Sequence, residues 1–187
     1  LIWLVSSTCY LVADDLKVAL AAEPTSMDPH YQNLTINNSF ATQIYNALVL
    51  QDVNQNLIPG LATSWKPVDD RTWEFTLRKN VKFHNGASFS AEDVIASMER
   101  AANVPNSPSS FATFTKGKKF VVVDDFTIRV STEKPYPFTP NDMSRISIID
   151  SAFLKATTED FNTGVASHGT GPFTLTKWLP GDVIEIA

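Results

Sequence analysis

The stretch from residue 57 to residue 100 constrains the fold of this chain more than any other part of the sequence. It reads LIPGLATSWKPVDDRTWEFTLRKNVKFHNGASFSAEDVIASMER. Apolar and polar side chains alternate over residues 73–77, which is the two-residue period of a half-buried strand. Turns are expected at residues 69–70 and 84–86, and a helix is expected over residues 90–100. The stretch therefore predicts a strand, a turn and a helix in close succession.

The rest of the chain predicts short elements separated by loops. Ser90 and Asp93 form a weaker version of the capping box, which prefers Glu or Gln at its last position. Pro135, Pro137 and Pro140 are expected to interrupt regular secondary structure. The hydrophobic fraction of 43% is ordinary for a globular protein. Strands are expected over residues 16–20, 48–50, 119–124, 126–131, 173–178 and 183–186, a helix over 38–47, and short helical turns over 151–155 and 158–161.

Three blocks of sequence carry a family resemblance. The first lies in the stretch already described, the second is Gly169-Thr170-Gly171-Pro172-Phe173 with Lys177-Trp178 and Pro180-Gly181-Asp182, and the third is Glu23 to Pro29. In order and residue type they resemble the family 5 extracellular solute-binding proteins of ABC importers, the dipeptide-, oligopeptide- and nickel-binding group. The positions in the first block are Ala62, Trp65, Asp69, Asp70, Thr72, Trp73, Phe75, Leu77, Arg78, Asn80, Val81, Phe83, His84, Asn85, Gly86, Ala91, Asp93, Val94 and Arg100.

The resemblance implies a fold and a domain division. The fold class is α/β, of the type II periplasmic-binding-protein-like kind. Residues 14–40 and 166–187 would build part of lobe I, and residues 41–165 the small extra subdomain of that lobe. The second lobe is expected to be absent, because in the family it would follow Ala187.

The resemblance also implies a function. It predicts a periplasmic or extracellular receptor that delivers a dipeptide or oligopeptide to an ABC permease, without a cofactor and as a monomer. Alternatives within the family are the binding of a nickel chelate, haem or a sugar. The net charge of −5 argues against a nucleic-acid partner, since nucleic-acid binding requires a basic face.

The first thirteen residues, LIWLVSSTCYLVA, are apolar and precede Asp14-Asp15. They resemble the end of a secretory signal peptide, and the alternative is a buried strand or helix. The stretch is shorter than the ~20 apolar residues that a membrane span needs. Cys9 is the only cysteine, so no intrachain disulfide can form. Lipid attachment at Cys9 is a weaker alternative, since residues 6–8 form a poor lipobox.

Candidate ligand-binding residues come from three places. Ala22, Glu23, Pro24 and Thr25 follow the first expected strand, and ligands of α/β sheets bind beyond the carboxyl ends of strands. The resemblance implies that this loop lines the cleft and that its backbone groups could pair with an extended peptide. Glu23 could then meet a cationic group, and the alternative is a solvated acid.

The other two candidates stand alone in the sequence. Thr170 lies in a loop that the resemblance places near the cleft, and the alternative is a backbone crossover. Arg145 could pair with a ligand carboxylate in bidentate fashion. The alternative for Arg145 is a salt bridge to Asp142 or Asp150.

An enzyme on this scaffold is the alternative from another class. His30, His84 and His168 stand at no zinc-like spacing, and no G-x-S-x-G motif is present. We therefore expect no catalytic residue and no metal site. A clustered, buried acid–base pair would favour an enzyme. His84 is expected to hydrogen-bond and fix its own turn, and Trp65, Trp73 and Trp178 are expected to pack.

Overall fold

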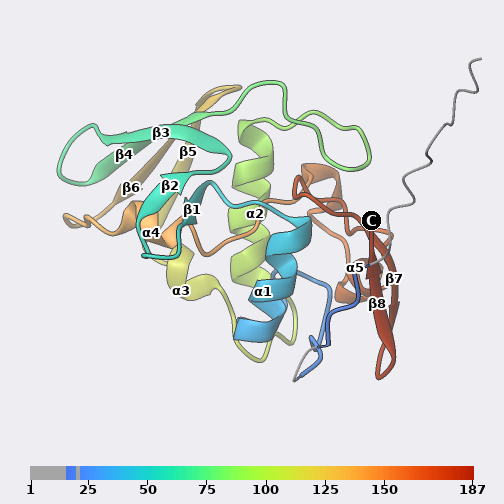
Figure 1. Cartoon of the computed structure of the whole chain (residues 1–187). Helices are drawn as coiled ribbons and strands as arrows, with labels where there is room; N and C mark the ends of the chain where they lie inside the picture. The colour runs from blue at the N-terminus through green and yellow to red at the C-terminus, as the bar shows by residue number, and fades with distance from the viewer. Residues whose placement is uncertain (1–15, 20–21) are drawn as a thin grey trace, which may run out of the picture.

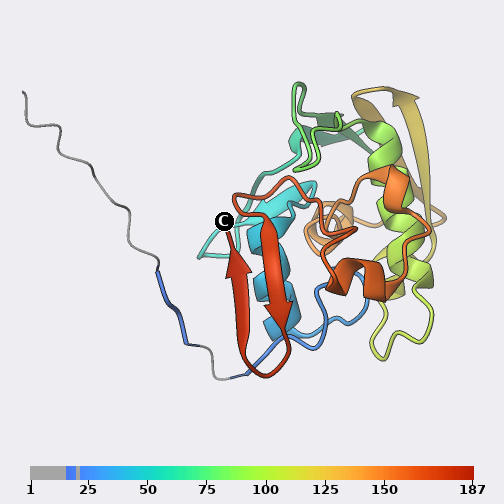
Figure 2. The same ribbon diagram turned by 90° about the vertical axis from the view of Figure 1, so that its right-hand side faces the viewer.

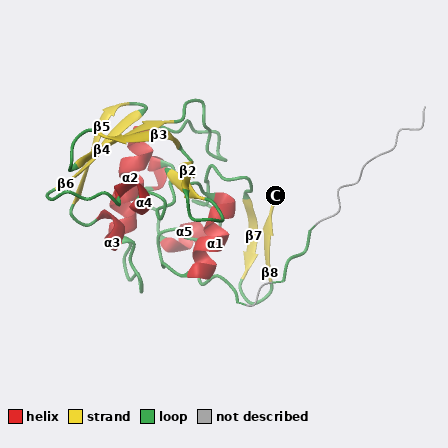
Figure 3. Cartoon of the chain, turned by 60° about the vertical axis from the view of Figure 1, so that its left-hand side comes forward, coloured by secondary structure: helices red, strands yellow, loops and turns green. Residues whose placement is uncertain are grey.

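The computed structural model describes residues 16–19 and 22–187. Its largest sheet has four antiparallel strands in the order β3–β4–β6–β5 (Figure 1). Two further hairpins, β1–β2 and β7–β8, form separate two-stranded sheets (Figure 3). The strands are β1 (Val49–Gln51), β2 (Leu57–Pro59), β3 (Ala62–Pro67), β4 (Thr72–Leu77), β5 (Lys118–Asp124), β6 (Thr127–Thr132), β7 (Leu175–Leu179) and β8 (Val183–Ile186).

The helices are short except for two. They are α1 (Thr35–Ile44), α2 (Ala91–Asn103), α3 (Ala112–Thr115), α4 (Thr139–Asp142), the 3-10 helix η1 (Ser151–Phe153) and α5 (Thr158–Asn162). The α/β class expected from the sequence is therefore confirmed.

The four-stranded sheet packs one face against α2. Phe75 on β4 and Ile128 and Val130 on β6 are fully buried with Val94 and Met98 of α2, and we call this cluster the sheet core. Each buried side chain of this size contributes about 1.5–3 kcal/mol relative to an exposed one. The alternation expected over residues 73–77 is confirmed, because Phe75 lies in this core on β4.

Helix α2 begins where the sequence predicts it. The backbone N–H of Ser90 donates to Asp93 Oδ2 at 2.7 Å, the contact that defines half of a capping box. Asp93 Oδ1 also accepts from the backbone N–H of Ser151 at 2.8 Å, and the side chain is buried. One carboxylate thus caps the helix and fixes a segment nearly sixty residues further along the chain.

A second apolar cluster lies away from the sheet. Met27, Ile44, Tyr45, Phe161 and Leu175 are buried together, and we call this cluster the hairpin core. It joins α1, α5 and the β7–β8 hairpin, which lie side by side in Figure 2. The chain passes from one core to the other at two places. Tyr45 belongs to the hairpin core and Leu48 to the sheet core, while Ile148 belongs to the sheet core and Ile149 to the hairpin core. The domain division at residues 40 and 165 stays a prediction.

Two expected elements and one expected break differ from the structure. Residues 16–19, part of the first expected strand, have no regular secondary structure, because a strand needs a neighbour with which to pair. Helix α1 starts and ends three residues before the expected 38–47, since Tyr45 is extended at φ −122°. Helix α4 forms despite Pro140, which stands in its first turn, where no intrahelical N–H bond is lost. The expected signal remnant and Cys9 lie outside the described residues.

Candidate functional site

His84 holds the glycine-rich loop of residues 169–171 rather than its own turn. Its backbone N–H donates to Gly169 O at 2.9 Å, and its ring bonds the loop at both nitrogens. The backbone N–H of Gly169 donates to Nδ1 at 3.2 Å, so Nε2 carries the proton and donates to Gly171 O at 3.0 Å. The sequence predicts a hydrogen-bonding role for His84, and the structure gives that role a different target.

The same loop lies closely against the end of α1. The backbone N–H of Gly171 donates to Ile44 O at 2.8 Å. A Cβ added at Gly169 would stand 1.9 Å from that same oxygen, so only glycine fits there. Asn46 Nδ2 donates to Thr170 O at 2.8 Å and lies 3.2 Å from Thr170 Oγ1. Thr170 is thus half-buried in a fixed loop at the C-terminal end of α1.

The loop of residues 22–25 lies at the other end of α1. The backbone N–H of Thr25 donates to Asn37 Oδ1 at 3.0 Å, and its hydroxyl donates to Gln32 Oε1 at 2.8 Å. Ala22 is exposed and Pro24 is buried. Asn37 and Ile44 are seven residues apart on α1, which is about 10 Å along a helix that rises 1.5 Å per residue.

Glu23 is exposed, and the β7–β8 hairpin occupies both of its oxygens. Trp178 Nε1 donates to Oε1 at 2.8 Å, and the backbone N–H of Gly181 donates to Oε2 at 2.8 Å. Trp178 packs against the hairpin core as expected, and it has this polar contact in addition. The hairpin therefore holds the Glu23 carboxylate in one orientation.

Arg145 is exposed, and neither expected salt bridge forms. Asp142 pairs with Lys118 at 2.6 Å, and Asp150 accepts from Asn85 Nδ2 at 2.8 Å. The prediction of an ion pair for Arg145 with either aspartate is wrong, because both aspartates have other partners. Within residues 22–187 no hydrogen bond or ion pair joins Arg145 to the other predicted site residues.

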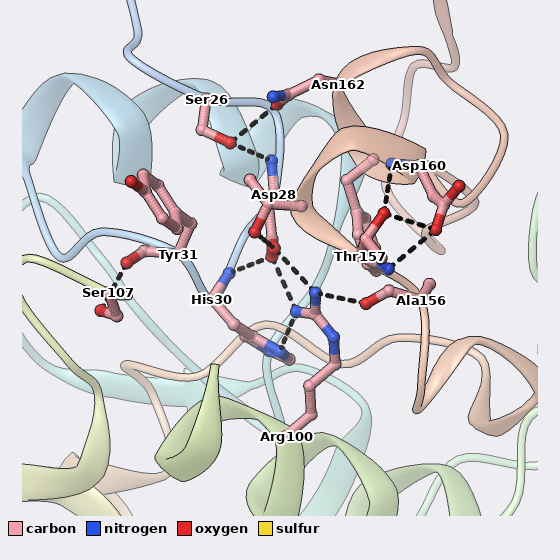
Figure 4. Close-up of polar contacts among 12 residues, drawn as sticks. Ser26, Asp28, His30, Tyr31, Arg100, Ser107, Ala156, Thr157, Asp160 and Asn162 are labelled. Atoms are coloured by element: carbon pink, nitrogen blue, oxygen red, sulfur yellow. Dashed lines mark hydrogen bonds and ion pairs between the residues drawn. The ribbon is translucent and has the colours of Figure 1, made fainter. Parts of the chain in front are cut away.

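A buried polar network joins three distant segments, and Figure 4 shows it in close-up. Arg100 of α2 donates from both terminal nitrogens to the two oxygens of Asp28, each at 2.7 Å. Arg100 Nη2 also donates to Ala156 O at 3.1 Å, and its guanidinium lies 4.3 Å from the Phe161 ring centre. Thr158 Oγ1 donates to Asp28 Oδ2 at 2.8 Å. This Asp28–Arg100 network ties the loop before α1 to α2 and α5.

His30 completes the network as a neutral ring. Its Nε2 lies 2.8 Å from the carbonyl oxygen of Ser147, which can only accept, so Nε2 carries the proton. Nδ1 is then free to accept from Arg100 Nη1 at 3.3 Å. Burial, followed by the charge of Arg100, lowers the pKa of His30 from 6.5 to about 4. Burial alone would raise the pKa of Asp28, but the hydrogen bonds and charge of Arg100 lower it.

The network is the clustered, buried acid–base pair that would favour an enzyme, yet its geometry argues against catalysis. Asp28, His30 and Arg100 are 2%, 0% and 6% exposed, and each polar group bonds to another part of the chain. Arg100 also borders a surface groove, but its terminal nitrogens already donate to Asp28, His30 Nδ1 and Ala156 O. Sequence reasoning missed this network, although Asp28 and Arg100 both stand in the resemblance blocks.

A groove of about 830 Å³ runs beside the network. Thr25, Tyr31, Asn103, Lys155 and Glu159 are among its lining residues. Thr25 is the one predicted site residue among them, so the groove is not where the predicted residues meet. Over the described part of the chain, no group of His, Cys, Asp and Glu side chains could hold a metal ion. Nor is any helix in that part long and apolar enough to cross a membrane.

Comparison with known proteins gives a consistent family. A family model described as bacterial extracellular solute-binding proteins, family 5 Middle, matches residues 56–187. The glutathione-binding protein GsiB of Salmonella choleraesuis (strain SC-B67) is 30% identical over 179 residues, which are 94% of this chain and 35% of that relative.

Two solved structures extend the comparison. NikZ from Campylobacter jejuni in complex with Ni(L-His) superposes with a TM-score of 0.74 at 27% identity, over 88% of this chain and 33% of NikZ. DppA from Helicobacter pylori in complex with the peptide STSA superposes with a TM-score of 0.72 at 26% identity, over 88% of this chain and 37% of DppA. The chain thus spans about a third of the length of these proteins, and the partial type II binding-protein fold is confirmed.

Proposed function

This chain belongs to the family 5 bacterial extracellular solute-binding proteins, and from that premise we propose that it forms one wall of the cleft of a peptide receptor. The receptor would deliver a dipeptide or oligopeptide to an ABC permease from the periplasmic or extracellular side. Each receptor would bind its solute as a single chain. The wall would consist of Ala22, Glu23, Pro24, Thr25 and Thr170.

The observation that carries this proposal is the placement of two loops at opposite ends of α1. The loop of residues 22–25 is hydrogen-bonded to Asn37, and the loop of residues 169–171 is bonded to Ile44. The separation of about 10 Å along the helix equals about three residues of an extended chain at ~3.3 Å each. A short peptide lying along this wall would reach both loops.

The mechanism would be closure of two lobes over the solute about a hinge. A ligand that contacts both walls binds the closed state more tightly and shifts the population toward it. Asn46 and His84 hold the Thr170 loop in one conformation before the ligand arrives. This pre-organisation reduces the entropy lost when the ligand binds.

A nickel-chelate ligand is the second candidate, and Arg145 is the observation in its favour. Its guanidinium is exposed and pairs with neither Asp142 nor Asp150, so it is available to a ligand carboxylate. NikZ, at 27% identity, was solved with Ni(L-His). No described contact favours haem, a sugar or an enzymatic reaction.

Replacing Glu23 by glutamine tests the peptide-binding wall. In a receptor of the relatives' full length that carries these residues, Glu23→Gln is expected to weaken binding of a peptide with a free amino group about tenfold. The reason is that a charge-assisted hydrogen bond is lost. Calorimetric titration measures the dissociation constant.

Trp178→Phe is the matched control for that experiment. It removes the indole donor to Glu23 but leaves the carboxylate in place. If Glu23 binds the ligand, the Trp178 variant keeps its affinity while the Glu23 variant loses it. Equal losses in both variants would show that Glu23 only positions the hairpin, and the ligand role would be abandoned.

A further inference from the structure

Asn85 and Gly86 form an asparagine–glycine pair in the turn that follows Phe83. The backbone N–H of Gly86 donates to Phe83 O at 2.8 Å, and Gly86 has a φ of 87°. Glycine adopts this left-handed region without the steric cost of a Cβ. The turn therefore requires a glycine after Asn85, and a glycine leaves its backbone nitrogen unhindered toward the Asn85 carboxamide.

The carboxamide of Asn85 is held at both of its polar atoms. Nδ2 donates to Asp150 Oδ2 at 2.8 Å, and Oδ1 accepts from the backbone N–H of Ala87 at 3.0 Å. Asp150 is 6% exposed, and its Oδ1 accepts from the backbone N–H of Ala152 at 2.9 Å. An amide can donate to Asp150 and accept from Ala87 at the same time, whereas a carboxylate can only accept. These contacts lie wholly within residues 85–152 and need no open surface.

We propose that Asn85 is a deamidation site, that the fold suppresses its reaction, and that Asp150 repels the acid produced. In the reaction, the Gly86 nitrogen bonds to Asn85 Cγ and the bond from Cγ to Nδ2 breaks. The proton of the Gly86 N–H leaves with Nδ2 as ammonia. Water then opens the ring at either carbonyl carbon, its hydroxyl going to that carbon and its proton to the Gly86 nitrogen. The product is aspartate or its β-linked isomer, and the site is independent of the proposed function.

The folded turn opposes ring closure in two ways. The Asn85 carboxamide has to break both of its hydrogen bonds before it can rotate freely toward the Gly86 nitrogen. That nitrogen also has to give up a proton that is hydrogen-bonded to Phe83 O. Since the reaction proceeds from opened turns, its rate follows the population of the opened state. Deamidation at Asn85 therefore reports local opening of the turn of residues 83–87.

The acid disrupts a contact between distant segments. A carboxylate at position 85 has no proton to donate, so two negative charges face each other in place of the 2.8 Å hydrogen bond. Like charges this close repel, and the burial of Asp150 strengthens the repulsion. His84 precedes Asn85 and bonds to Gly169 and Gly171. The turn that loses Asp150 is therefore also the turn that holds the glycine-rich loop.

Peptide mapping by mass spectrometry measures the conversion of Asn85 in the chain at mildly alkaline pH, once folded and once in denaturant. Conversion is expected to be at least about tenfold slower in the folded chain. Asp150→Asn removes the acceptor for Asn85 Nδ2, because its remaining oxygen stays with the Ala152 N–H, and is expected to speed conversion in the folded chain. The matched control is Asp182→Asn, at an exposed aspartate of the β7–β8 turn, which is expected to leave the rate unchanged.

Exchanging the two side chains gives the second arm of the test. Asn85→Asp reproduces the acid and is expected to lower the melting temperature by about 4 °C or more. Asn106→Asp makes the same change at an exposed asparagine and is expected to leave the melting temperature unchanged. Adding Asp150→Asn to Asn85→Asp places a donor opposite an acceptor again, so this double variant is expected to recover most of the loss.

Four outcomes would overturn the proposal. The first two are no conversion of Asn85 in denaturant and conversion that is as fast in the folded chain as in denaturant. The others are an unchanged melting temperature in the Asn85→Asp variant and no recovery in the double variant.

Discussion

Replacing Arg100 with methionine is expected to lower the free energy of unfolding by about 3–5 kcal/mol. The side chains of Arg100 and Asp28 are 5% and 0% exposed, and their two contacts are both 2.7 Å long. Methionine fills most of the space but leaves the Asp28 carboxylate buried without its cation. Chemical denaturation of the chain and of the variant measures the difference.

Arg129→Met is the matched control for that comparison. Arg129 also donates twice to one carboxylate, that of Glu74, at 2.9 and 2.8 Å. Its side chain is 47% exposed, so solvent screens the pair and its loss is expected to cost much less than the loss of Arg100. Equal losses of unfolding free energy in the Arg100 and Arg129 variants would contradict the view that burial makes the Asp28–Arg100 network the polar contact that stabilises this structure most.

Acid is expected to destabilise the chain through His30 as the pH falls from 6.5 toward 4. The pKa of His30 is about 4 in the folded chain and 6.5 ordinarily, so between these values the unfolded state binds a proton that the folded state refuses. The stability that neutral His30 contributes is therefore fully present above pH 6.5 and is lost as the pH falls toward 4. The slope contributed by this one histidine is at most about 1.4 kcal/mol per pH unit. Denaturation midpoints across this range measure it.

His30→Gln separates this histidine from the other titrating groups. A glutamine amide can still donate to Ser147 O, but it has no proton to gain in this range. The stability of the variant is expected to fall less steeply between pH 6.5 and 4 than the stability of the parent chain. Further loss at lower pH is expected in both, since Arg100 lowers the pKa of Asp28 in the folded chain and the stability that this adds disappears as the carboxylate is protonated. An unchanged slope in the variant would contradict the assignment to His30.

Local elements of this fold could be predicted because their signals lie within a few residues. The alternation at Trp73, Phe75 and Leu77 places β4, and the Ser90–Asp93 pair places the start of α2. Strands β5 and β6 form close to the expected ranges 119–124 and 126–131. Each of these depends on contacts made by neighbours in sequence or by one face of one element.

The contacts that join distant segments could not be predicted. Arg100 and Asp28 are 72 residues apart, and Arg100 reads as an ordinary charged residue near the end of an amphipathic helix. Burial of His30 depends on Ser147 and Phe111, neither of which the sequence near His30 indicates. Short helix α4 was missed because Pro140 suggests a break, although proline is tolerated in a first helical turn.

The candidate site was predicted in part. The sequence directs attention to the loops of residues 22–25 and 169–171, and the structure places them at the two ends of α1. It does not reveal that Glu23 is bonded to Trp178 and Gly181, or that His84 holds Gly169 and Gly171. These partners come from elements more than eighty residues away, and only the folded chain brings them together.

A thermal-shift screen tests the central claim most directly. It would use a receptor of the relatives' full length that carries these residues, with di- to pentapeptides, nickel chelates and sugars as solutes. Selective binding to the folded state adds about 2.7 kcal/mol of stability at a ligand concentration of one hundred times Kd. The 187-residue chain alone serves as the control and is expected to show no shift, since we propose that it forms only one wall of the cleft.

We expect the melting temperature of that receptor to rise with one class of peptide and to stay unchanged with chelates and sugars. A rise with a chelate or a sugar and with no peptide would contradict the peptide assignment and leave the family intact. No rise with any solute would contradict the cleft wall itself.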